Sequence, residues 1–259
     1  MKLHIVPART GAQWFKLGVL TFFKQPLALS GLFFMFMAVM TVLTLVPLIG
    51  NVLALALLPG ATLGLMAATE ETTKGKFPMP AVLLSAFRAG RQQLRAMLVL
   101  GVLYDLGFLL VLGISATVDG GKFAHLYLMG GVMTPETVME PDFEMAVLLA
   151  MALYMPLSLL FWHAPALVHW HGIPPVKSLF FSMVACIRNF WAFTVYSLMW
   201  LGAFIAMGLV ITVFAAIFGS PEVVASALFP MAMLMAAMFF TSIYFSFKDC
   251  FEDTRKDAP

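Results

Sequence analysis

The sequence PPVKSLFFSMVACIRNFW, residues 174–191, joins an amphipathic segment directly to a long apolar one. Its polar or small residues Ser178, Ser182, Ala185 and Asn189 follow the spacing of one stripe along an α-helix, and apolar residues occupy the other side. Two prolines at the start suit a first helical turn, where a missing N–H costs nothing. The segment therefore predicts an amphipathic helix that leads into a membrane-spanning one.

The same spacing recurs at two earlier places, at Trp14, Gly18, Thr21 and Gln25 and at Ala81, Ser85, Arg88 and Gln92. A basic residue and an amide residue close each copy, as Lys24-Gln25, Arg91-Gln92 and Arg188-Asn189. A repeated unit of this kind predicts a single polytopic domain, residues 1–259, with three pseudo-repeats at about 10–70, 78–168 and 174–248. Chance is the alternative, because basic amphipathic segments often precede membrane-spanning helices.

The composition places the chain in the membrane. Hydrophobic residues make up 62% of it and charged residues 11%, whereas a soluble domain has about 25% charged residues. Six apolar runs are long enough to cross about 30 Å of hydrocarbon, at 27–46, 52–68, 94–118, 145–163, 192–218 and 223–247. We expect an all-α integral membrane protein with six transmembrane helices in three hairpins, each preceded by a cytoplasmic amphipathic interfacial helix.

The charges predict the orientation. Every Lys and Arg except Lys122 falls on one side of the predicted spans, and most of the acidic residues of the other side lie in the 119–144 connection. The positive-inside rule then puts both termini in the cytoplasm and the chain in a bacterial inner membrane. The first apolar run begins too far from Met1 for a cleaved signal peptide, so we expect it to be retained as a span. Cys186 and Cys250 fall on the cytoplasmic side, where free thiols are expected.

The 119–144 connection is predicted to lie outside the membrane on the periplasmic side. Its apolar residues between Phe123 and Met129 are placed to cap the outer end of the bundle. Thr134-Pro135-Glu136 has the pattern of a helix start.

Asp105, preceded by Tyr104, is the main polar signal inside a predicted span. A charged carboxylate in mid-membrane costs about 2.5–3.5 kcal/mol, so Asp105 must be protonated, paired or next to water. Three interpretations remain open: a hydrogen bond between helices, a proton or cation relay, and a structural water cavity.

His163, His169 and His171 form a second signal, because histidine is a common metal ligand. Their spacing does not bring three ring nitrogens to one face of a helix, and it favours an interfacial cluster over a metal site. The chain contains no phosphate-binding glycine loop, nucleophile elbow or paired-histidine zinc motif. We therefore expect no enzyme activity, no cofactor and no nucleic-acid partner.

The chain also resembles a known group of proteins. Residues 164–168 (APALV), followed by an amphipathic helix and by 188–191 (RNFW), resemble the YciC-like uncharacterised bacterial inner-membrane proteins. The layout is similar to the membrane domain of some glycerophosphodiester phosphodiesterases. Residues 1–11 (MKLHIVPARTG), with Trp14-Phe15, are closer still to uncharacterised proteobacterial six-span proteins. The resemblance covers most of the chain and implies a fold and a location, but no activity. It does not extend to the phosphodiesterase enzyme domain.

Two functions fit these features. The first is a non-enzymatic inner-membrane protein that engages lipids or membrane partners through its basic interfacial helices. Its partners would be the phospholipid bilayer, through anionic headgroups contacting Lys24, Arg88, Arg91, Lys177 and Arg188, or another membrane protein. The second is a permease for a small or amphiphilic solute, with Asp105 lining the pathway.

Overall fold

The structure is a computed structural model that describes residues 2–46, 49–130, 133–218 and 221–251. Within these ranges the chain consists of helices and their connections, without a strand. The helices are α1 Thr10–Lys24, α2 Pro26–Thr44, α3 Ile49–Thr73, the 3₁₀ helix η1 Pro80–Leu84, α4 Ser85–Arg88, α5 Arg91–Asp119, α6 Lys122–Met129, α7 Pro135–Val138, α8 Pro141–Phe161, α9 Ala164–His171, α10 Pro175–Arg188, α11 Phe190–Phe218 and α12 Pro221–Phe251.

The described residues contain six helical segments that are long and apolar enough to cross a membrane. These segments are Pro26–Thr44, Ile49–Thr73, Arg91–Asp119, Pro141–His171, Phe190–Ile217 and Ser226–Phe251. Each matches one predicted apolar run, which confirms the all-helical fold class and gives six candidate spans. The fourth segment contains both α8 and α9, because the helix is interrupted at Trp162 and His163. The three-hairpin arrangement and the interfacial position of the amphipathic helices stay predictions.

A short helix, a break and a long apolar helix follow one another at three places in the chain. Lys24, Arg88 and Arg188 are each the last residue of the short helix. A cation there interacts favourably with the unpaired carbonyls at the helix C-terminus. The helix is then interrupted at Gln25 in the first copy and at Asn189 in the third.

The second copy of this arrangement differs from the sequence prediction. Its short helix consists only of η1 and α4, and the break falls at Gly90, whose φ of +111° favours glycine. Arg91-Gln92 therefore begins the long helix α5 and does not close the amphipathic helix. The predicted correspondence of Arg91-Gln92 with the other two basic-amide pairs was wrong, and Arg88 takes that place.

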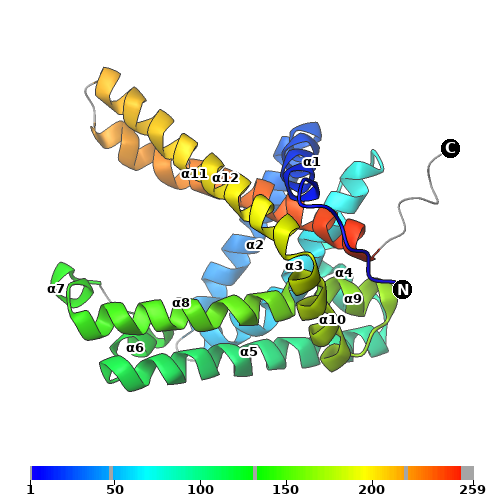
Figure 1. The fold of residues 1–259 in the computed structure, drawn as a ribbon, viewed down its shortest axis with the longest axis horizontal. Coiled ribbons are helices and arrows are strands. Elements are labelled where there is room, and N and C mark those ends of the chain that lie inside the picture. Colours follow the sequence, from blue (N-terminus) through cyan, green and yellow to red (C-terminus); the bar gives the residue numbers. More distant parts are fainter. Residues whose placement is uncertain (1, 47–48, 131–132, 219–220, 252–259) are drawn as a thin grey trace. The chain divides into compact units, whose positions relative to one another are not determined.

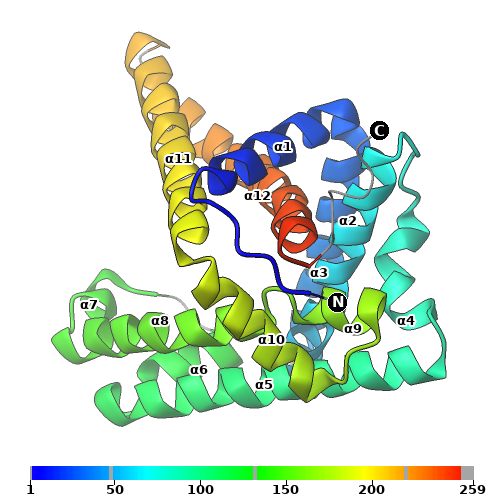
Figure 2. The same ribbon diagram turned by 45° about the vertical axis from the view of Figure 1, so that its right-hand side comes forward.

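The helices form two compact units. The first contains Met1–Phe36, Thr62–Ser85 and Ala185–Pro259, and the second contains Met37–Ala61 and Ala86–Val184. In the first unit α1 packs against α11 and α12, which also lie side by side (Figures 1 and 2). Its core contains Trp14, whose ring centroid lies 5.1 Å from that of Phe193 and 6.0 Å from that of Tyr196.

The second unit is built on the long helices α5 and α8, which lie side by side and antiparallel (Figures 1 and 2). Tyr104 of α5 meets Phe161 of α8, and Phe108, one turn further along α5, meets Tyr154, which precedes Phe161 on α8. The helix α6 packs against both, and α9 packs against α5. The apolar residues between Phe123 and Met129 therefore pack against this helix pair. That they cap the outer end of the bundle stays a prediction.

Candidate functional site

The polar stripe of α10 is buried. Ser178, Ser182 and Ala185 are fully buried, and Asn189, which follows the helix, is 2% exposed. The exposed face is apolar and contains Val176, Phe180 and Ile187 at exposures of about 60% or more. The Ser182 hydroxyl explains part of this orientation, since it donates to the carbonyl of Leu159 at 2.7 Å and accepts from the His163 N–H at 2.9 Å. The helix therefore turns its hydrogen-bonding groups towards the protein.

The helix α1 has the same orientation. Trp14, Gly18 and Thr21 are buried, whereas Leu17, Leu20 and Phe23 are exposed. The glycines allow close packing, because a methyl carbon placed on Gly18 would lie 2.3 Å from Cβ of Ser242, and one on Gly11 would lie 2.0 Å from the carbonyl oxygen of Ala192. Small residues permit this close approach of helices in membranes.

The predicted surface cations are all exposed. Lys24, Arg88, Arg91, Lys177 and Arg188 each lie on the outside of their own helix or at its end. The described residues contain ion pairs between Lys74 and Glu70 and between Lys122 and Glu140, and none of the five takes part in these. Their charges are therefore accessible to an external anion.

Asn189 is a structural residue, because its buried side chain binds backbone groups of the protein. Its side-chain carbonyl accepts from the Val6 N–H at 2.8 Å, and its amide donates to the carbonyl of His4 at 3.1 Å and to that of Ala185 at 3.1 Å. The His4 N–H in turn donates to the carbonyl of Cys250 at 2.9 Å. Asn189 therefore holds the segment before α1 against the ends of α10 and α12.

A second polar contact supports the same region and was missed by the sequence analysis. The indole N–H of Trp14 donates to Oδ2 of Asp249 at 2.8 Å. A buried indole needs such a partner, so the single tryptophan of the predicted α1 stripe was a usable signal. The sequence did not show that its partner would come from residue 249.

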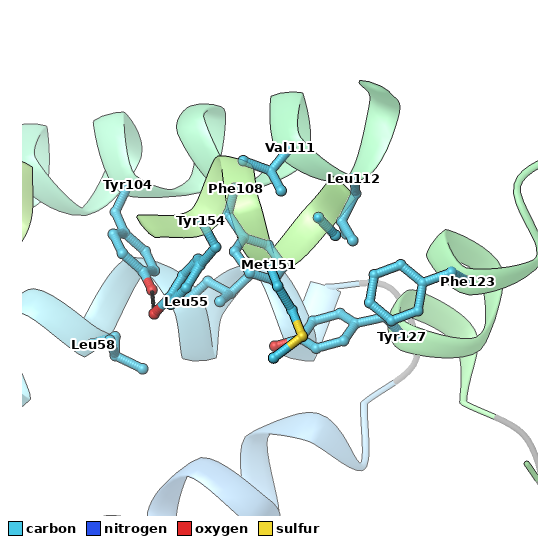
Figure 3. A pocket seen from close by; sticks show the side chains of 11 residues that line it. Leu55, Leu58, Tyr104, Phe108, Val111, Leu112, Phe123, Tyr127, Met151 and Tyr154 are labelled. Carbon is cyan, nitrogen blue, oxygen red and sulfur yellow. Dashed lines mark hydrogen bonds between the residues drawn. The ribbon is translucent and has the colours of Figure 1, made fainter. Parts of the chain in front are cut away.

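A cavity lined mainly by apolar and aromatic residues lies in the second compact unit and has a volume of about 320 Å³. Tyr104 and Phe108 of α5, Phe123 and Tyr127 of α6, and Tyr154 of α8 supply five aromatic rings to its wall (Figure 3). Apolar residues complete the lining: Leu55, Leu58, Val111, Leu112, Ala150 and Met151.

Three tyrosine hydroxyls supply the polar groups of this cavity. The hydroxyls of Tyr104 and Tyr154 are hydrogen-bonded at 3.0 Å, and they face the same part of the cavity near Leu58 (Figure 3). Tyr127 lies towards the α6 end of the cavity (Figure 3). Burial and, to a smaller extent, the neighbouring Tyr154 raise the pKa of its hydroxyl. This hydroxyl therefore stays protonated and able to donate. Tyrosines far from the ends of an apolar run were the signal in the sequence that was not used.

Asp119 positions the α6 wall of the cavity. Its carboxylate accepts from the N–H groups of Gly121 at 2.8 Å and Phe123 at 2.7 Å, which satisfies two donors at the start of α6. Gly120 and Gly121 have φ values of +67° and +89°, which suit glycine, and they let the chain turn directly from α5 into α6. Further along the connection, Thr134 caps α7 by accepting from the N–H of Thr137, as its sequence pattern predicted.

Asp105 is buried in α5 but is not among the residues that line the cavity. It lies on the buried stripe of α5, one turn after Gly101. At Gly101 the backbones of α5 and α3 are so close that an added methyl carbon would lie 2.2 Å from the carbonyl oxygen of Ala56 in α3. Its Oδ1 atom has no hydrogen-bond partner among the described residues. Tyr104 and Asp105 are therefore neighbours in sequence, but only Tyr104 contributes to the cavity.

The three histidines lie at the interruption of the fourth span and in α9. His163 is fully buried, and His169 and His171 are half-buried. Within the described ranges, no three His, Cys, Asp or Glu side chains are arranged as a group that could hold a metal ion.

A second, more polar cavity of about 350 Å³ adjoins the start of α5. It is lined by Gln92, Gln93 and Ala96 together with Val168 and residues 172–175. Arg91, which is exposed, directly precedes its two glutamines in the chain. This recess therefore offers hydrogen-bonding side chains at the start of α5.

Comparison with known proteins gives the family. No family model matches the chain, and no solved structure matches it. The chain is 37% identical, over 262 aligned positions, to a protein of Burkholderia thailandensis named "Probable inner membrane protein", and the alignment covers 100% of this chain and 97% of that relative. Together with the six apolar helices, this full-length similarity shows that the chain belongs to the family of that Burkholderia protein and is a multi-pass inner membrane protein.

Proposed function

We propose that this protein is a non-enzymatic inner membrane protein that binds anionic lipid at the membrane surface through α1, α10 and the start of α5. The observation that carries the proposal is the outward apolar face of α10, formed by Val176, Phe180 and Ile187, with the exposed cations Lys177 and Arg188 beside it. An exposed apolar face with basic neighbours is typical of helices that lie in the headgroup region.

The helix α1 supports the same proposal. Leu17, Leu20 and Phe23 are exposed, and Lys16 and Lys24 lie on the same outward side of the helix. Each Lys or Arg near an anionic surface contributes about 1 kcal/mol of attraction. The recess at the start of α5 adds the side chains of Gln92 and Gln93, which can hydrogen-bond to the oxygen atoms of a headgroup.

Native mass spectrometry of the purified full chain tests this proposal. We expect phosphatidylglycerol or cardiolipin to stay bound to the wild-type protein and to be reduced severalfold in a triple variant with Arg88→Glu, Arg91→Glu and Arg188→Glu. The control is Lys122→Glu, an exposed cation that the charge pattern places on the opposite side of the membrane. Equal retention of anionic lipid by the wild-type protein and the triple variant would contradict the proposal.

The proposed surface is cytoplasmic, as are both termini. The asymmetry of the basic residues supports this orientation, because all of them except Lys122 fall on one side of the spans. Fusions at the C-terminus test it: a green fluorescent protein should fluoresce, and an alkaline phosphatase should be inactive. The reverse pattern would overturn the orientation.

A permease for a small or amphiphilic solute is the second candidate. Two observations favour it: the cavity beside Tyr104, and the buried Asp105 whose Oδ1 has no partner among the described residues. An ionisable residue inside a span often marks a transport route. Flux into vesicles that contain the purified protein should fall in Asp105→Asn, and an unchanged flux would remove Asp105 from any pathway.

A further inference from the structure

The aromatic cavity of the second unit has no part in the proposed surface function. Its volume of about 320 Å³ falls at the lower end of small-molecule pockets, which are about 300–1,000 Å³. Tyr104 and Leu112 are both in its wall, and they are eight residues apart on α5, or about 12 Å at the helical rise. The cavity is thus an elongated space that runs along α5, from the Tyr104–Tyr154 pair to Phe123 and Tyr127 of α6 (Figure 3).

The Tyr104–Tyr154 pair defines what the inner end of the cavity can bind. In a hydrogen bond between two hydroxyls only one of them donates, so the second O–H is left to donate to another group. Both residues lie near the middle of their helices, α5 Arg91–Asp119 and α8 Pro141–Phe161. Within a membrane the donor has little water available, so an acceptor oxygen on a ligand would satisfy it.

This acceptor must be uncharged. A carboxylate in mid-membrane costs about 2.5–3.5 kcal/mol, and among the described residues no Lys, Arg or His lines the cavity to compensate it. A fatty-acid carboxylate or a phosphate headgroup therefore does not suit the inner end, whereas a neutral carbonyl does.

The walls favour a flat ring over a simple alkyl chain. Five of the residues that line the cavity are aromatic, and the ring centroids of Phe108 and Tyr127 lie 5.0 Å apart. The Met151 thioether lies among these rings (Figure 3), and aromatic faces and thioether sulfur are favourable surroundings for another conjugated ring.

We propose that this cavity binds an uncharged ring carbonyl compound of the lipid-soluble quinone class, with one carbonyl oxygen accepting a hydrogen bond from the Tyr104–Tyr154 pair. The apolar residues along α5 would surround its ring and the first part of its tail. The proposal concerns binding only, and it is independent of the basic surface on α1 and α10.

Binding of decylubiquinone to the purified full chain in detergent, measured by isothermal titration calorimetry, tests the proposal. Ala150 is 5% exposed and lines the cavity, so Ala150→Phe should fill it and weaken binding at least tenfold. Leu148→Phe is the matched control, because Leu148 is on the same helix but 54% exposed, and its affinity should equal that of the wild type. Arg91→Glu should also leave the affinity unchanged.

Two further measurements keep the test independent of the folding of Ala150→Phe. The double variant Tyr104→Phe/Tyr154→Phe removes both hydroxyls of the pair, either of which could donate to the ligand, and should weaken decylubiquinone binding about three- to tenfold, as expected for one neutral hydrogen bond. Decylbenzene, which has a ring and a tail but no carbonyl, should bind the wild type more weakly and should not distinguish the double variant from it. Equal binding of the two compounds to the wild type, or equal binding of decylubiquinone to the wild type and the double variant, would overturn the proposal, as would no binding of decylubiquinone at all.

Discussion

Replacement of Asn189 by alanine should release the segment before α1. The wild-type side chain makes two hydrogen bonds to this segment, from the Val6 N–H at 2.8 Å and to the His4 carbonyl at 3.1 Å. Each partly buried group left without a partner costs about 1–3 kcal/mol, and one further bond, from the His4 N–H to the Cys250 carbonyl, is retained. We therefore expect about 2–6 kcal/mol less resistance to local opening, which corresponds to roughly 30- to 20,000-fold at about 1.4 kcal/mol per factor of ten.

Amide hydrogen exchange of the protein in detergent, resolved to peptides that contain Val6, measures this opening directly. Exchange at Val6 should increase by that factor in Asn189→Ala. In Asn189→Asp the increase should be smaller, because the acceptor for the Val6 N–H is kept. Arg188→Ala is the control, since Arg188 is the exposed neighbour and makes no ion pair among the described residues. An unchanged exchange rate at Val6 in Asn189→Ala would show that this side chain does not hold the segment in solution.

Three other predictions concern single contacts. Gly18→Ala should lower the unfolding temperature, because its methyl carbon would lie 2.3 Å from Cβ of Ser242. Gly31→Ala should be neutral or stabilising, because no atom lies within 4 Å of its new methyl carbon. Equal shifts in the unfolding temperature of the two variants would contradict the packing. Burial raises the pKa of the Cys186 thiol to about 12. Its maleimide labelling at pH 8 should therefore be about 2,000-fold slower than that of a thiol of ordinary pKa near 8.5, and should become faster as the pH rises towards 12. Rapid labelling at pH 8 would refute this. Asp119→Ala should increase hydrogen exchange at Phe123 and weaken decylubiquinone binding, and no change in exchange would mean that the carboxylate does not hold α6.

The interior residues show where sequence reasoning was sufficient and where it was not. Tyr104 was named from the sequence only as the neighbour of Asp105, and the structure places it in the cavity wall. Tyr154 is equally polar and equally far from the ends of its run, but its role depends on its distance of 3.0 Å from Tyr104, which lies 50 positions away. Asp105 has the stronger polar signal and lies outside the cavity wall, because adjacent residues on a helix point about 100° apart.

The sequence by itself determined the membrane class, the six long apolar helices and two of the three places where a short helix meets a long one. These features depend on local composition and on helical periodicity, which act over one span or less. The stretch 174–191 shows the limit of such reasoning. Its periodicity correctly predicted the amphipathic helix that the structure shows as Pro175–Arg188.

Only the tertiary structure decided which side of that helix faces the protein. In water a polar stripe is expected to face outwards, but in a membrane the outer surroundings are apolar, so Ser182 and Asn189 form their hydrogen bonds inside the protein and Phe180 and Ile187 face outwards. The partners of these groups, Leu159, His4 and Val6, come from other parts of the chain. No local pattern specifies such partners, because they are chosen by the way the folded helices pack.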